Sequence, residues 1–273
     1  MHTVSLLFHD VYADSPRESG FQSDAADRYK LPVRDFEAQL AALAAAARNP
    51  PALATDLIPP GPFRPGRGHA ERPLLLTVDD GGVSYYTLLA DRLEALGWRG
   101  HCFVSTDAIG RRGFLDAAQI RELDARGHVI GSHSASHPRR FSACSLDDMR
   151  QEWVGSRHAL EDLLGHEVIA ASVPGGYYSR TVARTARDAG LRVLFTSEPT
   201  TAMRDERGIV VIGRFAIRRG HPADTARRLV LPPPWTRYSA WASWNAKGVV
   251  KPLLGPSYMR VADWIVGGPP CIK

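Results

Sequence analysis

Short apolar runs alternate with amphipathic stretches along most of this chain. The apolar runs are rich in β-branched residues or leucine and predict strands over residues 4–8, 74–78, 101–104, 129–130, 168–173, 192–196 and 209–217. Between them, apolar residues recur at spacings of three and four and predict helices over residues 34–48, 83–96, 117–125, 145–165 and 181–189. Repeated strand–helix units with buried strands are typical of a parallel α/β fold.

About seven strands favour a closed or nearly closed barrel over an open dinucleotide-binding sheet. No glycine-rich phosphate-binding motif follows any of these runs. The proline-rich stretch 49–73 is interpreted as a long loop within one domain. We therefore predict a single-domain (β/α)7-type barrel over residues 1–220, including the first strand and the long loop. A helical C-terminal extension over residues 221–273 is expected to pack on it.

Polar residues follow several predicted strands directly. The carboxyl ends of parallel strands share one rim of a barrel, so these residues should converge there. They are Asp79, Asp80, His133, His137, residues 174–178, Ser197 and Glu198. Two histidines and a carboxylate can hold a divalent metal, and the second carboxylate is then free to act as a base.

Two residues near this rim have open interpretations. His9 ends the first strand and either reaches the rim or is a buried histidine bonded to a loop carbonyl. Glu198 either contacts substrate or orients a catalytic group, or it is a solvated loop carboxylate.

Three motifs carry a resemblance to a known family. TVDDG at 77–81 and HVIGSHSASHP at 128–138 resemble the first two motifs of the polysaccharide deacetylases, the NodB-homology family or carbohydrate esterase family 4. VPGGYYS at 173–179 is similar to a variant of the third motif. The resemblance covers roughly residues 70–220 and implies a distorted (β/α) barrel that removes N-acetyl groups from a sugar polymer or its precursor.

The resemblance also implies roles for single residues. Asp80, His133 and His137 would bind the metal, commonly Zn²⁺, and Asp79 would be the general base. A backbone N–H after Pro174, that of Gly175, would stabilise the oxyanion.

The chain departs from the family pattern in its later motifs. An arginine that pairs with the base normally precedes the proline, whereas Ser172 and Val173 occupy those positions, and Tyr177 follows only after two glycines. The expected histidine of the last motif has one counterpart, His221. The proton donor is therefore predicted to be His221 first, then His9, then protonated Asp79.

Residues 214–260 combine basic side chains with tryptophans. Basic and aromatic residues together suit a membrane interface or a phosphate-bearing ligand. One hypothesis is that this region docks on the inner face of a membrane to reach a lipid-diphosphate-linked sugar. The favoured alternative is a pair of closing helices whose tryptophans pack on the barrel. They are Trp235, Trp241, Trp244 and Trp264.

Charge and cysteine content place further bounds on the protein. The net charge of +5 suits an anionic partner, but no nucleic-acid-binding motif accompanies it, so nucleic acid is not expected. Three widely spaced cysteines without a CxxC pair argue against a disulfide framework, and the N-terminus has no signal-peptide pattern. We expect a cytoplasmic protein, peripheral at the inner membrane face if the docking hypothesis holds.

Three functions stay open at this stage. The leading prediction is a metal-dependent N-deacetylase that acts on an N-acetylated saccharide. A hydrolase of small cyclic imides or amides on the same fold is the first alternative. The second is a catalytically weak, metal-binding module that recognises saccharides, because the later motifs depart from the family pattern.

Overall fold

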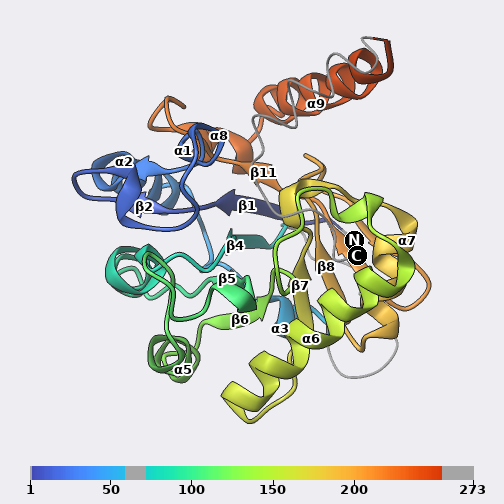
Figure 1. The fold of residues 1–273 in the computed structure, drawn as a ribbon. Helices are drawn as coiled ribbons and strands as arrows, with labels where there is room; N and C mark the ends of the chain where they lie inside the picture. Colours follow the sequence, from blue (N-terminus) through green and yellow to red (C-terminus); the bar gives the residue numbers. More distant parts are fainter. Residues whose placement is uncertain (1, 59–71, 254–273) are drawn as a thin grey trace.

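A curled nine-stranded sheet forms the centre of the protein (Figure 1). The structure is a computed structural model that describes residues 2–58 and 72–253, with side chains as far as residue 246. Eight strands pair in parallel, and β9 alone runs antiparallel beside β10. In spatial order the strands are β11 (Phe215–Ala216), β1 (Val4–Phe8), β4 (Leu74–Val78), β5 (His101–Val104), β6 (Val129–Ser132), β7 (Ala170–Ser172), β8 (Val193–Phe195), β10 (Val210–Ile212) and β9 (Met203–Asp205).

Helices surround the outside of the curled sheet. The predicted helix 83–96 starts as a π-helical turn, η2 (Tyr85–Leu89), and continues as α4 (Ala90–Glu94). The short strands β2 (Val11–Tyr12) and β3 (Leu31–Pro32) pair separately. The other helices are α1 (Asp24–Asp27), α2 (Val33–Ala44), α3 (Ala54–Leu57), α5 (Ala117–Ala125), α6 (Leu146–Leu164), α7 (Arg180–Asp188), α8 (Thr225–Val230) and α9 (Trp235–Leu253).

The predicted distorted barrel is confirmed. The strand β11 covers only the C-terminal half of β1, where it pairs with Leu6 and Leu7. At the N-terminal end of β1, the N–H of Thr3 instead donates to the carbonyl of Thr201, at 2.8 Å, just ahead of β9. The two sides of the sheet therefore meet around β1, although the ladder of strands does not close completely.

The predicted single strand 209–217 is wrong, because the chain forms two strands that pair near opposite edges of the curled sheet. The break lies at Gly213 and Arg214, where the chain crosses from β10 beside β8 to β11 beside β1. A side chain at Gly213 could not fit, since its Cβ would lie 2.4 Å from the carbonyl oxygen of Glu198. The N–H of Arg214 donates to that same carbonyl at 2.9 Å. The crossover thus places Arg214 inside the barrel, fully buried.

Apolar residues fill the barrel from both sides of the sheet, as expected for parallel strands covered on both faces. Inside the curl, Leu75, Phe103 and Phe195 pack with Ala54 and Ile58. These last two residues belong to α3 and the residue after it, within the stretch that the sequence predicted as a loop. The helix α3 therefore closes one end of the barrel.

His101 ties α3 to the strands. Its Nδ1 lies 2.8 Å from the carbonyl oxygen of Leu76, and its Nε2 accepts the N–H of Ala54 at 2.9 Å. This pattern assigns the proton to Nδ1 and leaves the ring neutral. Burial lowers the pKa of His101 from 6.5 to about 4.

The C-terminal helices contribute differently to the core. The apolar face of α8 packs into it through Ala226 and Leu229. In α9 the side chains of Trp235 and Trp241 are 72% and 49% exposed. The prediction that these two tryptophans pack on the barrel is therefore wrong. Trp244 is 37% exposed and lines a cavity between α9 and the barrel. Trp264 lies outside the described residues.

The cysteines differ in state. Cys102 is a buried free thiol, whereas Cys144 is disulfide-bonded. The sequence argued against a disulfide framework, and one bonded cysteine among the described residues does not make such a framework. Because disulfides persist in oxidising compartments, the prediction of a cytoplasmic location loses this support and stays a prediction.

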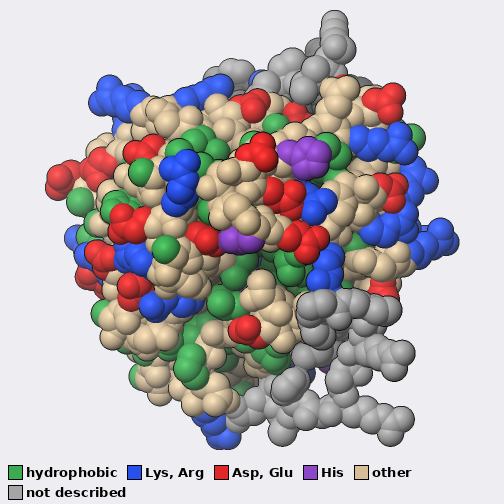
Figure 2. All heavy atoms as spheres, turned by 90° about the horizontal axis from the view of Figure 1, so that it is seen from below, with side chains coloured by type: hydrophobic (Ala, Val, Ile, Leu, Met, Phe, Trp, Pro, Cys, Tyr) green, Lys and Arg blue, Asp and Glu red, His purple; other side chains and the backbone are tan. Residues whose placement is uncertain are grey.

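The outer surface is mixed in charge. Figure 2 shows one face of the protein, on which basic and acidic side chains lie interspersed. Among the helices of the described ranges, none combines the length and the apolar character that crossing a membrane requires.

The state of His101 yields a stability prediction. Its folded pKa of about 4 lies below the unfolded value of 6.5, so its contribution is complete above pH 6.5 and is lost as the pH falls. At about 1.4 kcal/mol per pKa unit, the free energy of unfolding should fall by about 1 kcal/mol between pH 7.5 and 5.5 through this residue alone. In urea denaturation, His101→Asn should show a pH dependence smaller by that amount. The exposed His158→Asn is the matched control, and equal pH dependence in both variants would contradict the assignment.

Candidate active site

The carboxyl ends of β1, β4 and β6 meet at one rim of the barrel, where a cavity of about 490 Å³ opens. Each of these strands contributes polar side chains to it. They are His9 from β1, Asp79 and Asp80 from β4, and His133 and His137 from the loop after β6. Residues far apart in the sequence therefore share one cavity, as their positions after predicted strands indicated.

Asp80, His133 and His137 form a group that could hold a metal ion. Their ligand atoms all lie within 4.8 Å of one another. The Nε2 atoms of His133 and His137 lie 3.4 and 3.5 Å from Oδ1 of Asp80. Two imidazole nitrogens and one carboxylate oxygen are a donor set that suits Zn²⁺ and related divalent ions.

The protonation of these side chains also fits a metal. Nδ1 of His133 lies 3.0 Å from the carbonyl oxygen of Ser172 and donates to it, so Nε2 is the ring nitrogen that faces Asp80. Burial alone would lower the pKa of His133, but the Asp79 and Asp80 carboxylates raise it, so a metal ion would displace a proton from Nε2. Burial lowers the pKa of His137 to about 4, which keeps this ring neutral. Burial alone would raise the pKa of Asp80, but its hydrogen bond to His133 and the neighbouring imidazoles hold that pKa below its usual value.

A buried carboxylate fixes the loop that carries the two histidines. Glu152 of α6 accepts the N–H groups of Ala135 and Ser136, each at 2.9 Å, and the hydroxyl of Ser136 at 2.5 Å. It is 1% exposed. The sequence analysis missed Glu152, although a glutamate on the apolar face of a helix signals a buried partner.

The backbone is unusual at the same places. Asp80 and His137 adopt left-handed conformations, with φ of 79° and 56°. Such values are uncommon outside glycine and tend to occur at functional sites. The turn after β4 thereby directs the Asp80 carboxylate toward the histidines.

The other carboxylate, Asp79, is held by Arg214. The guanidinium donates to both carboxylate oxygens, at 2.7 and 2.8 Å. It also donates to the Thr196 carbonyl at 3.0 Å and to the hydroxyls of Ser172 at 2.8 Å and Thr77 at 3.2 Å. Burial alone would raise the pKa of Asp79, but Arg214 and then His133 lower it below its usual value. Asp79 is therefore ionised and able to accept a proton.

Arg214 fills the role that Ser172 and Val173 left vacant in the sequence. It arrives from the crossover between β10 and β11 instead of from β7, and Ser172 is one of its partners. The sequence contained a signal for it, because an arginine inside the apolar run 209–217 requires a buried counter-charge.

Of the two histidines predicted as proton donors, His9 is the one that lies in the cavity with Asp79. It lines the cavity, and its Nδ1 is buried without a hydrogen-bond partner. Its ring packs on Tyr29, with ring centroids 4.7 Å apart. Burial lowers the pKa of His9 below 6.5, whereas Asp80 and Asp79 act in the opposite direction. His221, by contrast, is exposed and does not line this cavity.

The remaining candidates divide in two. Gly175 and Tyr177 line the cavity, with Pro174 buried beside them. Glu198 does not line it, because its carboxylate pairs with Arg204 at 2.6 Å. Its backbone carbonyl accepts the N–H of Arg214, so Glu198 contributes to the crossover.

Comparisons with known proteins agree with this geometry. Residues 66–194 match the family model described as polysaccharide deacetylase. A Bacillus subtilis protein named for the same family, YxkH, is 24% identical over 151 residues, which is 55% of this chain and 53% of that protein. This chain therefore spans about half the length of the curated relative it matches.

Solved structures show the same fold. The Streptococcus pyogenes deacetylase PplD, solved in complex with acetate, superposes with a TM-score of 0.63 at 19% identity, covering 85% of this chain and 99% of that one. IcaB from Ammonifex degensii gives a TM-score of 0.62 at 23% identity, covering 88% and 97% of the two chains.

The proposed metal ligands can be tested without an activity assay. We expect calorimetric titration with Zn²⁺ to show one tight site per chain. His137→Ala should weaken it by more than about 100-fold, because loss of a direct ligand exceeds the 10- to 100-fold cost of losing an outer-shell partner. The exposed His158→Ala should bind as the wild type does. Unchanged affinity in His137→Ala would contradict the ligand assignment.

The buried ion pair predicts an unequal effect of two arginine substitutions. Arg214→Met leaves the Asp79 carboxylate buried and unpaired, and should lower the free energy of unfolding by about 3–5 kcal/mol. Arg204→Met breaks the partly exposed pair with Glu198 and should cost at most about 1 kcal/mol. Urea denaturation of both variants measures the two changes in the free energy of unfolding. Equal decreases would show that the buried pair stabilises the protein no more than the exposed one.

Proposed function

Because this chain belongs to the polysaccharide deacetylase family, we propose that it hydrolyses the N-acetyl group of a saccharide with the help of a divalent metal. The observation that carries the proposal is the division between two adjacent carboxylates. Arg214 holds Asp79 in its ionised form, while Asp80 faces His133 and His137. A base and a metal site therefore stand side by side in one cavity.

Asp80, His133 and His137 would hold the ion. When bound there, a divalent cation such as Zn²⁺ polarises the acetyl carbonyl and makes water more acidic. Asp79 then takes the proton from the attacking water, and the fixed contact with Arg214 aims its carboxylate. A backbone N–H in the turn at Gly175, which lines the cavity, would donate to the developing oxyanion.

The departing amine needs a proton, and we assign its delivery to His9 ahead of His221. His9 lies in the cavity with Asp79, and its lowered pKa makes the protonated ring a stronger acid. Asp79 is a poor donor because its pKa is lowered. The products are acetate and a free amino sugar.

The departures from the family motifs no longer favour a catalytically weak module. The missing arginine is supplied by Arg214, and the missing histidine has a counterpart in His9. Both come from strands outside the expected motif positions.

The finer substrate predictions remain hypotheses. A lipid-diphosphate-linked sugar and docking of residues 214–260 on a membrane would be tested together by flotation with anionic liposomes. Exposed Trp235 and Trp241 are compatible with such a surface. Absence of co-flotation at low salt would remove the docking hypothesis.

Acetate release tests the proposal directly. With Zn²⁺ or Co²⁺ added, the protein should release acetate from N-acetylglucosamine oligomers and should leave succinimide intact. Asp79→Asn and His9→Gln should each lower kcat by at least about 100-fold, the usual contribution of a general base or acid. His158→Gln is the matched control and should retain the wild-type kcat.

Two outcomes would contradict this account. Succinimide hydrolysis without acetate release would favour the imide hydrolase. A large loss of kcat in His221→Gln, with none in His9→Gln, would make His221 the proton donor.

A further inference from the structure

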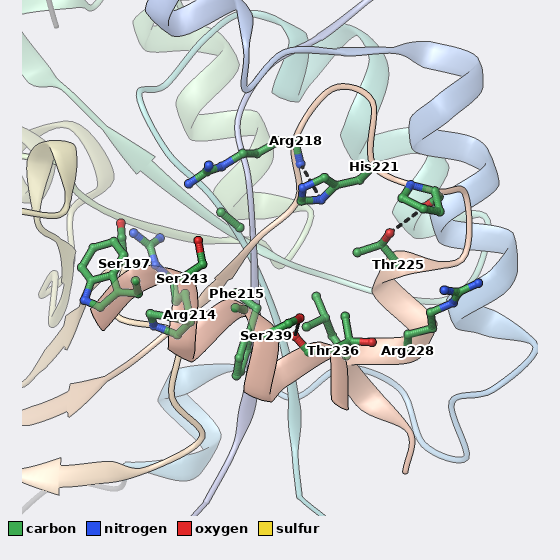
Figure 3. Close-up of a pocket in the computed structure, with 16 residues that line it drawn as sticks. Ser197, Arg214, Phe215, Arg218, His221, Thr225, Arg228, Thr236, Ser239 and Ser243 are labelled. Carbon is green, nitrogen blue, oxygen red and sulfur yellow. Dashed lines mark hydrogen bonds between the residues drawn. The ribbon is translucent and has the colours of Figure 1, made fainter. Parts of the chain in front are cut away.

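A second cavity adjoins the catalytic one. It measures about 450 Å³ and lies between β11 and the helices α8 and α9 (Figure 3). The two cavities share lining residues, so they are direct neighbours. The shared residues are Ser197, Ala216, Arg218 and Trp244.

Helix α9 turns a hydroxyl-bearing face toward this cavity. Thr236, Ser239 and Ser243 follow one another at spacings of three and four and line the cavity together with Ala240 and Trp244. In Figure 3 Thr236 and Ser239 lie along its lower side, with Arg218 and His221 across from them. Trp235 and Trp241 do not line the cavity, so α9 presents mainly small polar groups to it, together with Trp244.

Arg218 stands at the border between the two cavities. Its guanidinium lies 4.8 Å from the centroid of the Tyr29 ring, which stacks it in place. Across residues 2–58 and 72–246, no carboxylate lies within ion-pair distance of it; Asp224, on the same side of the barrel, pairs with Arg228 at 2.7 Å. A half-buried cation without an acidic partner is a ready site for an anion.

This cation lies close to the proposed proton donor. His9 packs against Tyr29, with centroids 4.7 Å apart, and Tyr29 in turn carries Arg218. One aromatic ring therefore separates the two side chains. An anion bound at Arg218 would belong to the reacting sugar or to the unit attached next to it, and not to a distant part of a polymer.

We propose that the second cavity is an anion subsite of the deacetylase, which holds a phosphoryl or carboxylate group attached to the N-acetylated sugar. This inference rests on the proposed function and specifies its substrate as an anionic saccharide. Arg218 supplies the charged donors, and the hydroxyls of Thr236 and Ser243 supply neutral ones, whereas the Ser239 hydroxyl donates to the Thr236 carbonyl. A neutral saccharide would leave Arg218 without a counter-charge.

Matched substrates test this subsite. We would measure kcat/KM for N-acetylglucosamine 1-phosphate, for N-acetylmuramic acid and for the neutral methyl N-acetylglucosaminide. In the wild type the anionic substrates should be preferred. Arg218→Gln, which keeps part of the side-chain stem over Tyr29, should lower the anionic-to-neutral ratio by about 10- to 100-fold, the value of a hydrogen bond to a charged group. The neighbouring Arg219→Gln should keep the wild-type ratio, because Arg219 is exposed and lines neither cavity.

The outcomes separate this inference from the proposed function. A ratio that falls for one anion only identifies the group as phosphoryl or carboxylate. Equal ratios in the wild type and both variants would overturn the subsite. If no substrate released acetate, the proposed function would fail. Calorimetric measurement of ligand binding would then test the anion subsite independently of activity. Tighter binding of N-acetylglucosamine 1-phosphate than of the methyl glycoside, lost in Arg218→Gln, would support it, and equal binding would overturn it.

Discussion

The buried ion pair between Arg214 and Asp79 is the interaction on which this site depends. Removing two charges from water costs several kcal/mol for each, and only good geometry with further hydrogen bonds offsets that cost. Here the guanidinium binds both carboxylate oxygens and three more acceptors, so its donors are well used. The pair keeps Asp79 ionised and holds both of its oxygens, although Oδ2 also lies 3.9 Å from Nε2 of His133. This contact distinguishes the two adjacent aspartates, since Asp79 is bound by Arg214 and Asp80 faces the two histidines.

Much of the barrel could be predicted because its signals are local. The strands Val4–Phe8, Leu74–Val78 and His101–Val104 have the predicted bounds, and the serine and glycine that flank the predicted helix 145–165 cap α6. The break in 209–217 was missed because its cause is a tertiary contact. Apolar residues continue on both sides of Gly213, and the close approach of Gly213 to the Glu198 carbonyl appears only in the folded chain.

In the site, too, some residues could be predicted from local sequence signals and others depend on tertiary contacts. Asp79, Asp80, His133 and His137 follow strands, so topology alone predicts that they meet. The partner of Asp79 could not be placed in this way, because side chains from any strand of a barrel can reach the same rim. Arg214 takes a position that the family motifs assign elsewhere in the sequence, and geometry identifies it. His9 was one of three candidate proton donors in the sequence, and its place in the cavity is the reason we propose it ahead of His221. Glu152 extends this principle, since a helix on the outside fixes the loop of the metal group.

The central claim is that Arg214 separates the roles of Asp79 and Asp80. Anomalous diffraction at the zinc edge, from crystals of the full chain soaked in Zn²⁺, tests it most directly. The account predicts one strong peak within bonding distance of Asp80, His133 and His137, with both oxygens of Asp79 still on Arg214. A peak bonded to Asp79, or an Asp79 carboxylate released from Arg214 in the metal-bound protein, would contradict it.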